Sequence, residues 1–232
     1  MKRLIIILSV LALTTTAFTQ EKPAADSSSS HYKQHTLFCH TALPQLPFGY
    51  FLGLSGSYTK FGNKDVFMPG ISMGIILSHH WTIGMQANGI GNSRDLKYPN
   101  VHYNETDSAW HTGQLGGGYG GALFEYTLFP ESVVHVSFPL IIGGGYMFYY
   151  KEDHHSDHHN SNHDKNWHMT TYSHDYFFTV EPGIRMEINL ARMLRLGIKV
   201  SYRYSPDFKL PNVSSGLLNQ FNAGIDLRIG KF

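Results

Sequence analysis

Residues 176–189, YFFTVEPGIRMEIN, and residues 194–205, LRLGIKVSYRYS, decide the fold. In both stretches every second residue is apolar, and apart from Phe177 the residues between are charged, polar or small, as where Ile184 and Met186 flank Arg185. This period of two predicts β-strands, because successive side chains of a strand point to opposite faces. Each of these two strands therefore has one apolar face and one polar, charged face.

The same alternation recurs along the chain from Phe48 onward and predicts eight strands joined as a meander. The fourth strand is the least regular, because five glycines between residues 116 and 121 blur its pattern. We expect strands over residues 49–60, 66–78, 81–92, 114–128, 133–149, 176–189, 194–205 and 218–230.

The period alone does not say which face lies inside. In a soluble sandwich the apolar face points inward, whereas in a membrane barrel it meets lipid and the polar face fills the lumen. The connections after the second, fourth and sixth predicted strands are short, and those at 93–113, 150–175 and 206–217 are long. Short turns at one end and long loops at the other are typical of outer-membrane barrels. The connection at 62–64 is short although it belongs to the long side.

Strand length and aromatic residues favour the same interpretation. The predicted strands span about 11–15 residues, whereas strands of soluble proteins average about 5–6 and a tilted transmembrane strand needs about 9–11. Aromatic residues gather toward the strand ends on the apolar face, as expected for two interfacial girdles. They are Tyr50, Tyr58, Trp81, Phe124, Tyr126, Tyr146, Phe148, Tyr176, Phe178, Tyr202 and Tyr204.

The sequence therefore predicts an all-β protein whose residues 48–232 form an eight-stranded antiparallel up-and-down transmembrane β-barrel. A soluble lipocalin-like barrel with its apolar face inside is the alternative. The 232 residues carry a net charge of +1, which argues against a polybasic nucleic-acid binder. The single cysteine excludes an internal disulfide framework and a zinc site built on paired cysteines.

The first residues predict a secretory signal peptide over residues 1–19. A positive start is followed by the apolar run 4–13, and Ala17 and Thr19 fit a cleavage site before Gln20. Residues 20–47 show no periodicity and predict a flexible periplasmic arm.

With this leader, eight amphipathic strands and an aromatic last residue, the chain resembles the small outer-membrane β-barrel proteins of Gram-negative bacteria, the OmpA/OmpX-like group. The segments VEPG at 180–183 and VSYRY at 200–204 are similar to barrels common in Bacteroidetes. The resemblance implies a place in the cell outer membrane, in contact with outer-membrane lipid.

The resemblance also implies that the barrel-assembly machinery recognises the last strand by its terminal aromatic residue, here Phe232. Ile225, Leu227 and Ile229 are out of phase with this residue. We expect a β-bulge near residues 230–231 to restore the phase.

The inward faces of the predicted strands carry four acidic and five basic side chains. An eight-stranded barrel is just wide enough for side chains to fill it, and unpaired charges there would be costly. We therefore predict a lumen plugged by ion pairs, with a narrow ion-conducting pore as the alternative. The charged residues are Glu125, Glu181, Arg185, Glu187, Arg195, Lys199, Arg203, Asp226 and Arg228.

The connection at 150–175 is rich in histidine, whose neutral ring binds Zn, Cu or Ni. The candidate ligands are His154, His155, His158, His159 and His163. Capture of a metal or of a surface ligand by this connection is one interpretation. A solvated loop whose histidines protonate near neutral pH is the other.

An enzymatic role has less support. His135 and Ser137 resemble the H-x-S of lipid A deacylases, but both fall on the predicted lumen face, away from outer-leaflet lipid. We therefore expect no enzyme and no cofactor other than a metal at the histidines. The expected role is structural, or lies in contacts with another membrane or surface protein.

Overall fold

The structure is a computed structural model of the chain. It describes residues 36–37, 48–101, 111–152, 169–206, 208–211, 213–214 and 216–232. The predicted signal peptide over residues 1–19 lies outside the described residues, as does the arm 20–47 apart from Thr36 and Leu37. The chain divides into two compact units, 1–31 and 32–232, and all described residues belong to the second.

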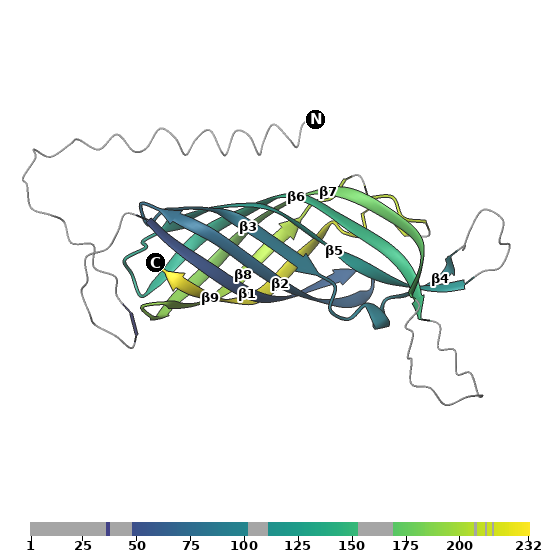
Figure 1. The fold of residues 1–232 in the computed structure, drawn as a ribbon, viewed down its shortest axis with the longest axis horizontal. Coiled ribbons are helices and arrows are strands. Elements are labelled where there is room, and N and C mark those ends of the chain that lie inside the picture. The colour runs from purple at the N-terminus through teal and green to yellow at the C-terminus, as the bar shows by residue number, and fades with distance from the viewer. Residues whose placement is uncertain are drawn as a thin grey trace, which may run out of the picture. The chain divides into compact units, whose positions relative to one another are not determined.

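Eight long strands form a closed antiparallel barrel, shown in Figure 1. Each strand pairs with the next along the chain, and the last pairs with the first, which closes the sheet. The strands are β1 (Phe48–Phe61), β2 (Lys64–Leu77), β3 (Trp81–Gly89), β5 (His111–Leu128), β6 (Val134–Glu152), β7 (Met169–Ala191), β8 (Leu194–Arg203) and β9 (Gln220–Lys231). The predicted all-β, eight-stranded, antiparallel up-and-down barrel is confirmed.

The long connections contain more structure than the sequence predicts. A 3₁₀-helix, η1 (Ser93–Asp95), and a short strand, β4 (Lys97–Val101), lie within the predicted loop 93–113. The predicted loop 150–175 is shorter than expected, because β6 and β7 stay paired as far as Glu152 and Met169. Threonine and tyrosine at residues 170–172 favour this extended backbone. Among the described residues, no helix combines the length and apolar character needed to cross a membrane.

The two ends of the barrel differ, as predicted. The turn end holds the connections 78–80, 129–133 and 192–193, together with the start of β1 and the end of β9. The loop end holds the short turn between β1 and β2 and the three long connections. At the turn end, Ser78 and His79 have φ of 50° and 61°, and His80 N donates to Leu77 O at 3.2 Å. Two left-handed residues in succession are typical of the tight turns that join twisted antiparallel strands.

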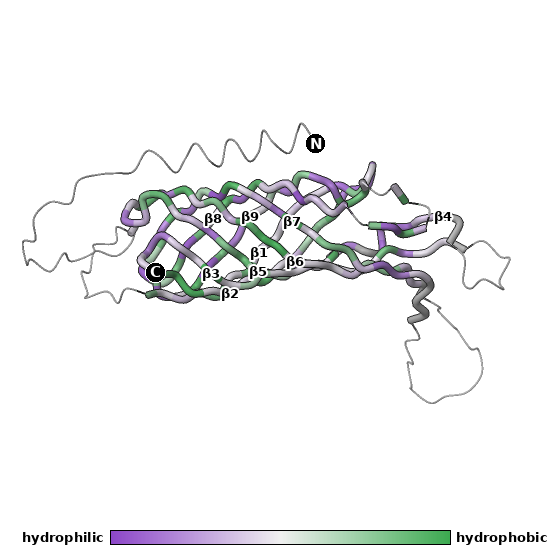
Figure 2. Tube along the Cα trace, turned by 90° about the horizontal axis from the view of Figure 1, so that it is seen from above, coloured by the Kyte–Doolittle hydropathy of each residue, from purple (hydrophilic) through white to green (hydrophobic). Residues whose placement is uncertain are grey.

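Apolar side chains cover the outside of the barrel and charged side chains lie within it. Ile184 and Ile198 are 58% and 54% exposed, whereas the adjacent Arg185 and Lys199 are 2% and 6% exposed. Figure 2 shows the alternation of hydrophobic and hydrophilic residues along the strands. This distribution is the reverse of that in a soluble barrel, so the lipocalin-like alternative is wrong.

Aromatic rings on the outer surface pair near both ends. At the turn end the ring centroids of Trp81 and Tyr126 are 4.7 Å apart, and toward the loop end those of Tyr146 and Tyr176 are 4.8 Å apart. Both pairs lie within the range of favourable ring contacts. These pairs lie at the two ends of the barrel, where the sequence predicts the aromatic girdles.

Glycine is required where β5 and β6 approach each other most closely. Gly121 lies opposite Gly143 in their register. A Cβ atom on Gly143 would lie 2.0 Å from Gly120 O, and one on Gly121 would lie 2.2 Å from Ile142 O. No side chain fits at either position without moving a strand.

Candidate functional site

The interior of the barrel holds a concentration of buried charge. All nine charged residues that the sequence assigns to the lumen lie inside, and none is more than 6% exposed. They come from β5 (Glu125), β7 (Glu181, Arg185, Glu187), β8 (Arg195, Lys199, Arg203) and β9 (Asp226, Arg228). His135 of β6, 1% exposed, joins them.

The charges are confined to one part of the wall. The buried polar side chains of β1, β2 and β3 are all uncharged: Thr59, Ser72, Thr82, Gln86 and Asn88. Among the described residues, every buried charge therefore belongs to the consecutive strands β5 to β9.

The register of these strands sets basic residues beside each other. Arg195 lies directly opposite Arg228 between β8 and β9, and Arg185 lies opposite Lys199 between β7 and β8. Like charges in such positions destabilise a sheet. Carboxylates from other strands must therefore reach these groups across the lumen.

Glu125 bridges two arginines. Arg185 Nη1 lies 2.5 Å from Glu125 Oε2, and Arg228 donates Nη1 to Oε1 at 3.0 Å and Nη2 to Oε2 at 2.7 Å. The two nitrogens of Arg228 thus meet the two carboxylate oxygens in the paired geometry that makes arginine–carboxylate contacts strong.

Glu187 connects further groups to this pair. Its Oε1 lies 3.0 Å from Arg228 Nη1, and its Oε2 lies 2.9 Å from His135 Nε2 and 3.8 Å from Arg195 Nη1. Asp226 lies 3.0 Å from Arg185 Nε. The result is one continuous ion network with members from five strands.

Glu181 forms a second, smaller group. Lys199 Nζ donates to its Oε1 at 3.0 Å, Ser201 Oγ donates to the same oxygen at 2.6 Å, and Tyr119 Oη donates to its Oε2. Each carboxylate of the two groups therefore has at least one basic side chain within 3.0 Å.

Arg203, 0% exposed, makes contacts of another kind. Its Nε donates to Leu218 O at 2.9 Å, and its Nη1 lies 3.3 Å from Met68 Sδ. Its Cζ atom lies 5.2 and 5.0 Å from the ring centroids of Phe61 and Tyr119. Aromatic faces and a carbonyl thus stabilise this cation.

A cluster of buried apolar side chains lies at the loop end. Four of its members belong to the connection between β8 and β9, which folds inward. The prediction of an outer loop over 206–217 misses this inward fold, for which the apolar residues of the segment are the available signal. The members are Phe61, Val66, Met68, Leu96, Leu115, Tyr119, Met147, Tyr149, Phe177, Phe208, Leu210, Leu217 and Leu218.

Hydrogen bonds hold this connection in place. Tyr149 Oη donates to Pro211 O at 3.1 Å, and Lys209 N donates to Asp175 Oδ2 at 2.5 Å. Together with the bond from Arg203 to Leu218, they attach the connection at both its beginning and its end.

Phe232 lies inside the barrel rather than on the apolar outer face. The pairing of β9 with β1 continues without a register shift to Lys231, so the predicted bulge at 230–231 is wrong. The ring is 4% exposed, and Arg195 Cζ lies 4.0 Å from its centroid. The interior accommodates the ring because Phe232 belongs to a second buried apolar cluster, together with Phe51, Ile76, Leu123 and Ile141.

Two other features that the sequence singles out are the candidate metal ligands and the H-x-S pair. His154, His155, His158, His159 and His163 lie outside the described residues. Within the described part of the chain, no group of three or more histidine, cysteine or acidic residues is placed to hold a metal. His135 and Ser137 are 1% and 0% exposed, and His135 Nε2 faces Glu187, so a lipid substrate has no access to either.

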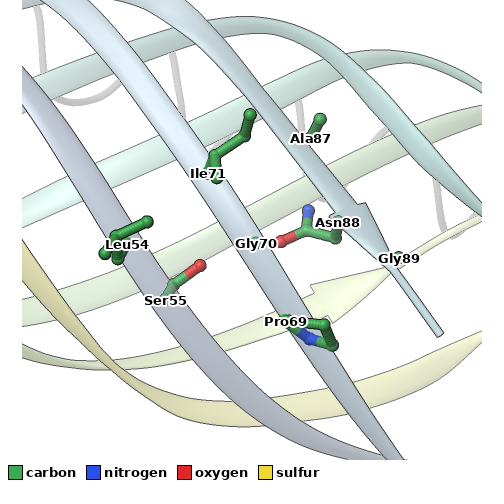
Figure 3. A pocket seen from close by; sticks show the side chains of 8 residues that line it. All are labelled: Leu54, Ser55, Pro69, Gly70, Ile71, Ala87, Asn88 and Gly89. Carbon is green, nitrogen blue, oxygen red and sulfur yellow. The ribbon is translucent and has the colours of Figure 1, made fainter. Parts of the chain in front are cut away.

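A shallow depression lies on the outer face over β1, β2 and β3, shown in Figure 3. Leu54 and Ile71 flank it, and Gly70 forms part of its floor. A Cβ atom on Gly70 would lie 2.4 Å from Asn88 Oδ1 and 2.6 Å from Ser55 Oγ, so side chains from the two neighbouring strands occupy that space. The depression belongs to the apolar outer surface and is separate from the ion network.

No model of a known protein family matches the chain, and no curated protein matches it. Among solved structures it is similar to the N-terminal β-barrel domain of Pseudomonas aeruginosa OprF (10% identity, 78% of this chain and 96% of that chain, TM-score 0.46). It is also similar to Neisserial surface protein A (13%, 81% and 98%, TM-score 0.47). A third similar structure is Ail, the attachment invasion locus protein of Yersinia pestis (10%, 79% and 97%, TM-score 0.42). At this level of similarity the family of the chain stays a prediction, including the resemblance to barrels of Bacteroidetes.

Proposed function

We propose that the protein is an integral outer-membrane β-barrel whose lumen is plugged by its own side chains. Its role is structural, or lies in contacts that its loop-end connections make with another membrane or surface protein. The observation that carries the proposal is the arrangement of the wall, with apolar side chains outside and paired charges inside.

The outer surface supports a lipid environment. Soluble monomers rarely expose apolar patches larger than a few hundred Å². Here large apolar side chains on the outward register are widely exposed, including Leu54 at 59%, Met85 at 64% and Ile225 at 62%. Hydrocarbon is the solvent that such a surface fits, and closure of the sheet leaves no strand edge unpaired in it.

The interior supports a plug rather than a narrow pore. Conduction requires a continuous polar path along the lumen. The members of the ion network contact each other across the lumen, and a buried apolar cluster lies toward the loop end, which supports the plug. No enzymatic activity is proposed, since the buried His135 and Ser137 lack access to substrate.

Membrane insertion is tested by labelling single cysteines in a Cys39→Ser background. A fluorophore on Ile184→Cys or Ile198→Cys should be quenched by brominated lipid, whereas one on Lys209→Cys in the loop-end connection should not. Fractionation and heat-dependent gel mobility provide a second measurement. Extraction of the protein without detergent would refute the proposal.

The plug is tested separately by planar bilayer recording of the purified protein. We expect no stable conductance. A stable, large conductance would overturn the plug in favour of the pore and would leave the membrane barrel intact.

Phe232 enters the proposal as the assembly signal. Its ring is buried in the closed barrel, so the assembly machinery would have to bind the ring before β9 pairs with β1. The test is to compare Phe232→Ala with wild type for the folded fraction in the outer membrane. Equal fractions would remove this role.

A further inference from the structure

Residues 36 and 37 of the N-terminal arm contact a strand of the barrel that is distant from them in the sequence. Leu37 N donates a hydrogen bond to Asn189 O, near the end of β7, at 3.1 Å. Thr36, the preceding residue, is only 6% exposed, although the Leu37 side chain is 51% exposed. The backbone of the segment is thus bound while one of its side chains faces outward.

Asn189, which accepts this hydrogen bond, is itself held by further hydrogen bonds. Asn189 is 0% exposed, and its backbone N donates to Val133 O at 2.8 Å. Its side-chain Nδ2 donates to Ser132 O at 2.9 Å, which fixes the connection between β5 and β6. Asn189 is therefore held firmly by the residues just before β6.

Strand geometry explains why the arm binds here. The backbone N–H and C=O of one strand residue point to the same side, so the Asn189 carbonyl faces the β6 side, beside Val133. The β6–β7 pairing begins at Val134 opposite Ile188, whereas β7 continues to Ala191. On this side of β7, Asn189 thus binds Val133 through its N–H and Leu37 through its carbonyl oxygen.

We propose that Thr36 and Leu37 form a clip that binds the end of β7 at Asn189, at the turn end of the barrel. The occupant is this chain's own segment at residues 36–37, bound through the main-chain hydrogen bond from Leu37 N to Asn189 O. The arm, predicted to be flexible, is thus attached to the barrel at a second point besides its covalent link to β1. The clip does not depend on the membrane proposal, because its contacts lie at the turn end and not on the apolar face.

Hydrogen exchange of the full chain in detergent micelles tests the clip directly. The Leu37 amide should exchange at least about tenfold more slowly than the same amide in a free peptide of residues 30–45, because a hydrogen-bonded amide exchanges only when its contact opens. Leu37→Ala keeps the backbone N–H and should leave the Thr36 amide unchanged. Exchange of Leu37 at the rate of the free peptide would overturn the proposal.

A spin label supplies a second measurement. A nitroxide on Ser132→Cys, in a Cys39→Ser background, leaves the Ser132 carbonyl in place and should broaden the Thr36 amide resonance. Leu37→Pro removes the donor N–H and should abolish this broadening, while heat-dependent gel mobility reports whether the barrel still folds. Equal broadening in Leu37→Pro, or none in the parent, would refute the clip. Membrane insertion is read from lipid quenching in the same samples, so the two proposals fail independently.

Discussion

Glu125→Gln is the substitution that best tests the buried ion network. The carboxylate accepts one contact from Arg185 at 2.5 Å and two from Arg228 at 3.0 and 2.7 Å, and it is 2% exposed. Glutamine preserves the size of the side chain and removes the charge. The interior then contains three acids against five bases, instead of four against five, and both guanidinium groups lose their nearest counter-charge.

The expected loss is large because neither arginine can reach water. Removing one partner of a buried ion pair costs about 3–5 kcal/mol, most of which is the penalty of the charge left behind. With a urea dependence of about 1–3 kcal/mol per M, the unfolding midpoint should fall by more than about 1 M. Tryptophan fluorescence during urea unfolding in lipid vesicles measures it.

Two further variants control the experiment. Asp65→Asn removes an exposed partner of Lys60, 3.6 Å away, and should leave the midpoint nearly unchanged. Glu125→Gln combined with Arg228→Met removes one acid and one base, and should cost less than the sum of the two single variants. An unchanged midpoint in Glu125→Gln, or strict additivity in the double variant, would refute the paired network.

Three other predictions follow from the same structure. Gly143→Ala should lower the folded fraction measured by heat-dependent gel mobility, because its Cβ would lie 2.0 Å from a backbone oxygen, whereas Gly89→Ala, whose nearest atom is 3.9 Å away, should match wild type. Burial lowers the pKa of His79 below its ordinary 6.5, so the unfolded chain binds more protons and stability is lost as the pH falls through 6.5. His79→Gln should reduce this loss in unfolding curves between pH 5 and 8, and an identical pH dependence would contradict it. Zinc titration should show tighter binding to wild type than to a 153–168 deletion if the histidines form a site, and equal weak binding would dismiss it.

The period of two carries most of what the sequence predicts. It places each side chain inside or outside, so the nine charged residues could be assigned to the interior without knowledge of their partners. The unequal lengths of the connections then indicate which strand ends lie together. These signals are local, and each strand carries them independently.

The partners themselves could not be predicted. Which base meets which acid depends on the tilt and stagger of the strands around the barrel, which no single strand encodes. The inward fold of the connection containing Phe208 and Leu218 escaped prediction for a similar reason, since its apolar residues lack strand periodicity. The place of Phe232 depends on an unbroken register with β1, and the Leu37 contact depends on a strand end distant in sequence.

The confinement of buried charge to β5–β9 bears on how the barrel closes. These five strands carry four acidic and five basic buried side chains, so most of the buried charge is compensated within their own sheet. The three strands from β1 to β3 bring uncharged inner faces to complete the cylinder. Separation of β1 from β9 would break the contact between Arg228 Cζ and the Phe51 ring, whose centroid lies 4.3 Å away. Among the described residues, the joint between β1 and β9 closes the wall without an ion pair between these two strands.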